Sequence, residues 1–167
     1  MDANDVKLAV SHFLDLVANG REGERENVKA LVVALDMLAW MQHVAGEEAT
    51  SPDPSHEPAA PAAPEREYDK MRGLVAQQFP SFGYYSTPAN PADQNGEAEM
   101  LAGDAGADLA NIACELYEIA WLFQNQRDAE ALRAFSDGYE RRWRSLLRTL
   151  QWYIERRRRD AWSGEAP

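Results

Sequence analysis

The sequence predicts an all-α protein, a bundle of about five helices with a proline- and alanine-rich linker between the second and third helices. Apolar residues recur at three- and four-residue spacing along most of the chain, which is the spacing of one helix face. Strand signals are nearly absent, because no six-residue stretch rich in β-branched residues alternates apolar with polar side chains. The chain has 167 residues, 45% of them apolar. This is enough to bury a core, and we expect residues 1–167 to form a single helical domain.

The first helix is expected at residues 4–18 and ends at Asn19-Gly20, since glycine adopts a left-handed cap at little cost. Its apolar stripe comprises Val6, Ala9, Val10, Phe13, Leu14 and Val17.

The second helix is expected at residues 26–45, ends at Gly46, and is apolar on two nearly opposite faces. One face comprises Val28, Leu31, Val32, Leu35, Leu38 and Ala39, and the other Val33, Met37, Trp40 and Val44. Such a helix lies either at the centre of the bundle, which we favour, or at the interface of a homodimer formed through this helix.

Residues 47–64 read EEATSPDPSHEPAAPAAP and are predicted to form a flexible linker. Five prolines and several small residues are incompatible with regular structure. The PxxP spacing within it also matches ligands of proline-reading domains. Because this spacing arises by chance in proline-rich runs, we favour a simple tether.

Three further helices are expected at residues 65–79, 104–124 and 128–159. The third ends at Pro80 and is followed by an aromatic loop, in which Phe82, Tyr84 and Tyr85 either cap the bundle, which we favour, or line a ligand pocket. The fourth carries a coiled-coil-like seam of Leu109, Ile112, Leu116, Ile119 and Phe123. The stripe of the fifth comprises Leu132, Phe135, Tyr139, Trp143, Leu146, Leu150 and Ile154. The turn between the last two helices is short, so they should be antiparallel neighbours.

Charge is unevenly distributed along the chain. Its 17 basic and 28 acidic residues give a net charge of −11. Residues 1–137 hold 9 basic and 24 acidic side chains, a net of −15, whereas residues 138–167 hold 8 arginines and 4 acidic residues, a net of +4. The acidic body repels phosphate backbones, so we expect no nucleic acid on it. The run Arg156–Arg159 is suited to an acidic partner, an anionic membrane surface or the acidic body of the same chain.

An acidic strip on the fourth helix is the best candidate for chemistry. Asp108, Asn111, Glu115 and Glu118 fall within an arc of about 80° beside the apolar seam. Asp108, Glu115 and Glu118 are therefore candidate ligands for Mg²⁺ or Mn²⁺. The alternative, which we favour, is that Arg142 of the antiparallel last helix neutralises the strip, because it should lie beside Asn111 and Glu115.

Several function classes lack their sequence signatures here. One cysteine, Cys114, provides no disulfide framework, and we expect it to be an inert small residue. The sequence contains no H-E-x-x-H, E-x-x-H, G-x-S-x-G, P-loop or G-x-G-x-x-G motif. No apolar run approaches the length of a membrane span, and no secretory signal is evident, so we expect a cytoplasmic protein.

Four segments, taken in order, resemble a bacterial all-helical family of unknown function. They are Tyr68-Asp-Lys-Met-Arg, the loop from Tyr84-Tyr85 to Pro91, DLANIACELYEIAWLF at 108–123 and YERRWRSLLRTLQWYI at 139–154. Asn111 stands where this family has an acid, and Arg142, Arg144 and Ser145 stand where many members have His or Gly. The resemblance, located in the second half of the chain, implies an all-α fold and no known activity.

The sequence thus favours a non-enzymatic binding or adaptor module with an unknown protein partner. Its candidate binding surface comprises Tyr84, Tyr85, Arg142, Trp143, Arg156, Arg157, Arg158 and Arg159. The alternative is a divalent-metal-dependent enzyme that acts on a small phosphorylated substrate through the acidic strip, since an acidic cluster needs a cation before it tolerates phosphate.

Overall fold

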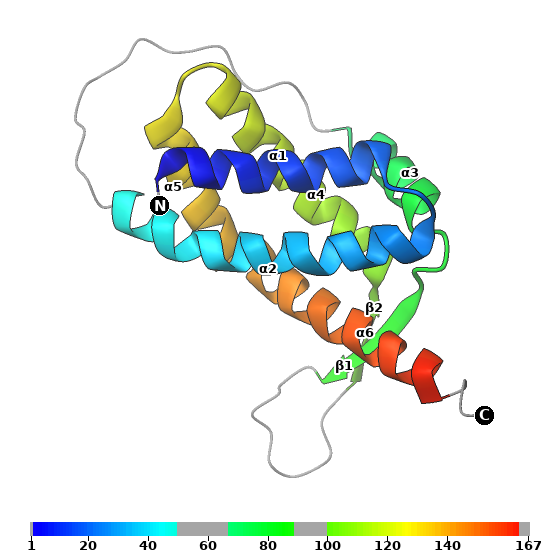
Figure 1. Cartoon of the computed structure of the whole chain (residues 1–167). Helices are drawn as coiled ribbons and strands as arrows, with labels where there is room; N and C mark the ends of the chain where they lie inside the picture. The colour runs from blue at the N-terminus through cyan, green and yellow to red at the C-terminus, as the bar shows by residue number, and fades with distance from the viewer. Residues whose placement is uncertain (1, 50–66, 89–99, 164–167) are drawn as a thin grey trace.

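The computed structural model describes residues 2–49, 67–88 and 100–163, and these residues form an all-α bundle with one small β-hairpin (Figure 1). The helices are α1 (Ala3–Asn19), α2 (Glu24–Ala49), α3 (Tyr68–Gln78), α4 (Ala105–Gln124), α5 (Asp128–Gly138) and α6 (Arg144–Ser163). A π-helical turn, η1 (Tyr139–Trp143), joins α5 to α6, so these three elements form one interrupted helix. The predicted bundle of about five helices is therefore confirmed.

Local capping fixes both ends of α1 and the start of α4. Asp2 and Asp5 form a capping box at the start of α1, and Gly20 ends that helix with a φ of 65°. At the start of α4 the Asp104 carboxylate accepts hydrogen bonds from two amides of the first turn at 2.9 and 3.0 Å. The third helix begins at Tyr68 rather than at residue 65 as the sequence suggested.

The core lies between the α1–α2 pair and the remaining helices. In Figure 1, α1 and α2 lie side by side and run in opposite directions in front of α4, α5 and α6. The predicted seam of α4 is buried at every position, and the α1 stripe is buried except for the partly buried Leu14. The largest fully buried side chains include Phe13, Phe79, Phe135 and Trp143. All helices thus contribute to one hydrophobic cluster.

The last helix differs from the uninterrupted helix expected at residues 128–159, because η1 inserts a wider turn. The core residues Phe135, Tyr139, Trp143 and Leu147 follow at four-residue spacing. In an ideal α-helix each such step drifts by about 40° around the axis, and a π turn corrects that drift. Leu147 is consequently buried in the core, whereas Leu146, which the sequence placed there, is only partly buried.

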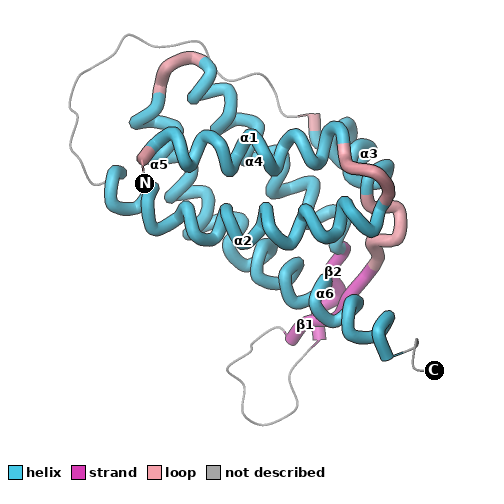
Figure 2. The backbone as a smooth tube through the Cα atoms, in the orientation of Figure 1, coloured by secondary structure: helices cyan, strands magenta, loops and turns pink. Residues whose placement is uncertain are grey.

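The aromatic loop also differs from expectation, because part of it pairs as a hairpin (Figure 2). Strands β1 (Tyr84–Pro88) and β2 (Met100–Asp104) are antiparallel, with Tyr84 opposite Asp104 and Pro88 opposite Met100. The strands are short and mostly exposed, so they lack the apolar alternation that reveals a longer strand. A glycine is required at position 103, since the Tyr85 ring occupies the space of a Cβ there.

Helix α2 is not central in the bundle, contrary to the interpretation favoured above. Val33 and Trp40 on its second apolar face are 53% and 56% exposed. The helix also continues beyond Gly46 to Ala49, since the sequence there contains glutamate and alanine, which favour helix. The first three residues of the predicted linker are therefore helical, and its residues 50–64 lie outside the described residues.

One helix in the described part of the chain is long and apolar enough to cross a membrane by length and composition alone. It is the segment Glu24–Gly46 of α2, which contains an 18-residue window with a mean hydropathy of 1.3. Core helices of soluble proteins meet the same criterion, and 39% of this window is buried in the bundle, so the observation is weak evidence.

Candidate functional site

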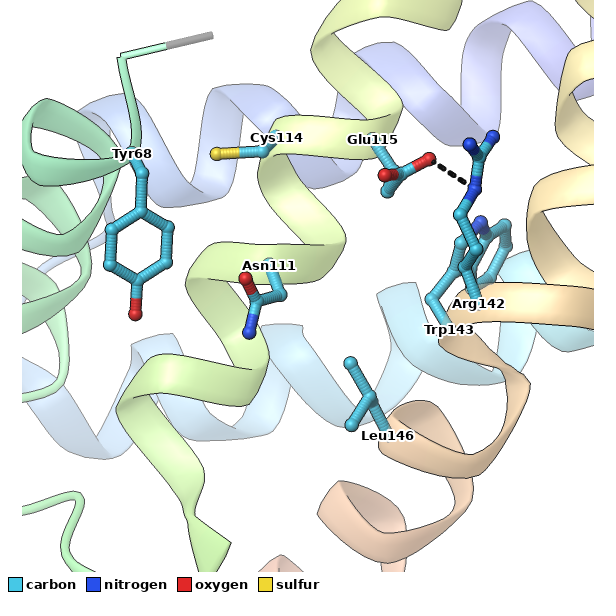
Figure 3. A pocket seen from close by; sticks show the side chains of 7 residues that line it. All are labelled: Tyr68, Asn111, Cys114, Glu115, Arg142, Trp143 and Leu146. Atoms are coloured by element: carbon cyan, nitrogen blue, oxygen red, sulfur yellow. Dashed lines mark ion pairs between the residues drawn. The ribbon is translucent and has the colours of Figure 1, made fainter.

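A cleft of about 340 Å³ opens between the start of α3, the middle of α4 and the junction of η1 with α6. Its lining combines aromatic and aliphatic side chains with an amide, a carboxylate and a guanidinium (Figure 3). The lining residues are Tyr68, Asn111, Cys114, Glu115, Arg142, Trp143 and Leu146. Sequence reasoning identified Glu115, Arg142 and Trp143 as site residues but missed Tyr68 and Leu146. Leu146 reaches the cleft because the π turn moves Leu147 into the core position.

An ion pair between α4 and η1 forms one end of this cleft. Arg142 Nε lies 2.9 Å from Glu115 Oε2, and Figure 3 shows the two side chains pointing toward each other. The antiparallel register about the short turn near residue 126 predicts this pair, and the structure contains it. The Glu115 side chain is 13% exposed and that of Arg142 is 52% exposed, so the guanidinium is accessible from the cleft while the carboxylate is mostly covered.

Trp143 forms a wall of the cleft and is at the same time a core residue. Its ring packs edge-on against Phe135 and Tyr139, with centroid separations of 5.3 and 5.0 Å. Among the residues that the structure describes, its buried Nε1–H has no hydrogen-bond partner. The nitrogen lies against the backbone of Gly138, where an added Cβ would stand 2.8 Å from it. Gly138 thus permits the close approach of the indole ring to the helix backbone.

Asp108 lies away from the cleft, at the hairpin end of α4. It is buried and accepts a hydrogen bond from the Tyr85 hydroxyl. Burial raises the pKa of Asp108, while the bond from Tyr85 acts in the opposite direction. Burial and the contact with Asp108 together raise the pKa of Tyr85. Next to this pair, Arg72 Nη2 binds Asp104 at 2.8 Å and anchors α3 to the start of α4.

Two acids of the strip therefore have different partners. Asp108 binds Tyr85, Glu115 binds Arg142, and Glu118 is partly buried one turn further along α4. Within residues 2–49, 67–88 and 100–163, no group of three or more His, Cys, Asp or Glu side chains is arranged to hold a metal ion. The suggested binding of Mg²⁺ or Mn²⁺ through Asp108, Glu115 and Glu118 stays a prediction.

The aromatic residues after α3 pack against α6. Phe82 and Tyr85 lie 5.5 and 5.7 Å from the Tyr153 ring, which is the capping role favoured from sequence. Arg157 joins this contact: its terminal nitrogens donate to the Ser81 carbonyl at 2.9 Å and to the Ser81 hydroxyl at 3.0 Å. Arg157 is thus an internal clasp. Tyr84, by contrast, is 81% exposed and turns away from this cluster.

The outer face of α6 presents a basic stripe, which we define as Arg144, Arg148, Trp152, Arg156 and Arg159. All five are exposed and follow helical spacing on the side opposite the core. The Arg156 guanidinium lies 5.7 Å from the Trp152 ring centre. Two members of the stripe also pair with acids on the same helix, Arg144 with Glu140 at 2.9 Å and Arg159 with Glu155 at 2.8 Å.

Comparison with known proteins places this arrangement in a family. The model of a family described as "Domain of unknown function (DUF5063)" matches residues 2–151. The match covers the N-terminal helices as well as the second half of the chain, to which the sequence patterns had confined the resemblance. No curated protein matches the chain. No solved structure matches it either.

Proposed function

The chain belongs to this family of unknown function, and we propose that it is a non-enzymatic adaptor that binds an acidic segment of a partner protein through the basic stripe of α6. The observation that carries the proposal is the stripe itself: four exposed arginines and one exposed tryptophan on a single helix face. Between Arg144 and Arg159 this face extends about 22 Å at 1.5 Å per residue, enough for a peptide of several residues.

The charge distribution supports an acidic partner. Residues 1–137 carry a net charge of −15, so an acidic chain is repelled by most of the molecule and attracted to the +4 segment that contains α6. Trp152 adds an exposed apolar surface in the middle of the stripe. Tryptophan and arginine are the residue types that contribute most at protein interfaces, which favours a protein partner.

The test variant removes the arginines of the basic stripe and keeps the contact between Arg157 and Ser81. In the variant Arg144→Gln/Arg148→Gln/Arg156→Gln/Arg159→Gln, Arg157 is kept because it anchors the Ser81 segment. Binding is measured by fluorescence anisotropy with a labelled peptide rich in Glu and Asp. We expect the variant to bind at least about tenfold more weakly, and binding by the wild type to weaken as salt rises.

A matched control removes the same number of positive charges elsewhere. Lys7, Arg25, Lys29 and Lys70 are exposed and lie outside α6, so their joint replacement by glutamine should leave peptide affinity within about twofold. Equal loss in the two variants would mean that net charge alone governs binding. A stripe that binds anionic lipid vesicles but not the acidic peptide would contradict a protein partner.

A further inference from the structure

We propose that the cleft at the Glu115–Arg142 pair binds a small zwitterion, an α-amino acid with an apolar side chain. The cleft lies between α3, α4 and the junction of η1 with α6, and no residue of the basic stripe lines it. Three properties of the cleft support the proposal: its paired charges, its apolar walls and its size.

The charges of the cleft are opposite and adjacent, and both side chains line the cleft. Glu115 and Arg142 lie in contact at 2.9 Å, and the ammonium and carboxylate groups of an α-amino acid are held on one carbon atom at a similar spacing. The ion pair engages Arg142 Nε, and a guanidinium has further N–H donors on its two terminal nitrogens, which suit a carboxylate. A carboxylate such as Glu115 accepts several hydrogen bonds and suits an ammonium group.

The net charge of the surroundings favours a ligand of zero net charge. A simple anion meets the negative charge of Glu115 beside Arg142. A simple cation meets the positive charge of Arg142 beside Glu115. A zwitterion satisfies both groups and adds no net charge to the site.

The remainder of the cleft is suited to an apolar side chain. Trp143 and Leu146 stand on one side and the Tyr68 ring on the other, while the exposed Asn111 amide lies between them (Figure 3). The volume of about 340 Å³ is at the lower end of the range of small-molecule sites, roughly 300–1,000 Å³. A ligand of the size of one amino acid fits this range better than a nucleotide or a larger cofactor.

The ligand test uses isothermal titration calorimetry with three compounds that share one aromatic side chain. L-phenylalanine has both charges, phenethylamine lacks the carboxylate, and 3-phenylpropionate lacks the ammonium group. We expect saturable binding of L-phenylalanine and at least tenfold weaker binding of the other two. Equal affinity for either analogue, or no heat from L-phenylalanine up to about 10 mM, would overturn the proposal.

Variants locate the binding within the cleft. Arg142→Gln and Glu115→Gln should each weaken L-phenylalanine binding at least tenfold. Leu146→Trp should block the apolar part while it keeps both charges, so it tests the site even if loss of an ionic partner disturbs the fold. Arg144→Gln is the matched control, because Arg144 lies on the outer face of α6, outside the cleft, and is paired with Glu140 of η1. Unchanged affinity in Leu146→Trp, or equal loss in Arg144→Gln, would contradict the assignment.

Discussion

Glu115 is the residue at which the structural and metal-binding interpretations of the acidic strip make opposite predictions. Its carboxylate is mostly covered and lies 2.9 Å from the half-exposed Arg142 guanidinium. If the pair is structural, Glu115→Gln removes a charged partner. We then expect a loss of about 0.5–1 kcal/mol in the free energy of unfolding, a modest value because Arg142 is largely solvated. Urea denaturation with and without millimolar MgCl₂ or MnCl₂ measures both the loss and any effect of metal.

The metal-dependent alternative predicts the opposite effect of Glu115→Gln on the free energy of unfolding. Without a cation, carboxylates that share a metal site repel one another, so Glu115→Gln would then stabilise the metal-free protein and abolish stabilisation by added metal. A stabilised variant that no longer responds to Mg²⁺ or Mn²⁺ would favour the enzyme hypothesis over a purely structural pair.

Residue-level reasoning from the sequence succeeds where both partners lie on strongly periodic helices. The seam of α4 and the antiparallel register about its C-terminal turn are sufficient to place Arg142 beside Glu115. It does not succeed for Asp108, because its partner Tyr85 comes from a short hairpin without an alternating pattern. The sequence accordingly grouped Asp108 with Glu115, whereas the fold pairs Asp108 with Tyr85 and Glu115 with Arg142.

At the level of elements, the π turn is the feature that the sequence pattern could not specify. Helical spacing placed Leu146 in the core, and a one-residue change in register replaces it with Leu147. The four-residue spacing of Phe135, Tyr139, Trp143 and Leu147 can be seen in the sequence, and in an ideal α-helix it would rotate the apolar face around the axis. The helix could either stay regular and let its apolar face rotate, or insert a π turn that keeps the face in place. Which of the two occurs depends on what packs against Trp143, and that is a property of the tertiary structure.

Gly138 tests this packing. Replacing a glycine inside a helix by alanine normally raises the free energy of unfolding by about 0.5–1 kcal/mol. At position 138 the added Cβ would stand 2.8 Å from Trp143 Nε1, so we expect Gly138→Ala to destabilise the protein by about 1–3 kcal/mol. Chemical denaturation followed by circular dichroism gives the sign of the change in the free energy of unfolding.

Gly73 provides the control for that substitution. It lies within α3, and a Cβ added there meets nothing within 4 Å among the described residues. Gly73→Ala should therefore raise the free energy of unfolding by about 0.5–1 kcal/mol, as is usual inside a helix. If both glycine substitutions stabilise, the contact between Gly138 and Trp143 does not constrain the π turn.

For the whole molecule, the exposed part of the second face of α2, formed by Val33 and Trp40, leads to the last prediction. Since α2 is not central, the remaining explanation of its two apolar faces is a subunit interface, and we propose a homodimer in which two copies of α2 pack antiparallel. Val33 of one copy then faces Trp40 of the other.

Sedimentation velocity across a range of protein concentrations measures this association. We expect a weak dimer, with a dissociation constant of roughly micromolar order, because the apolar strip is narrow and each copy carries a net charge of −11. Val33→Ser/Trp40→Ser should leave a monomer. Leu8→Ser, which removes an equally exposed apolar side chain from α1, should not change the association. Screening of the mutual repulsion should strengthen the dimer as salt rises, because its contact is mainly apolar. A wild-type protein that sediments as a monomer at every concentration would show that this face of α2 is not an interface between copies.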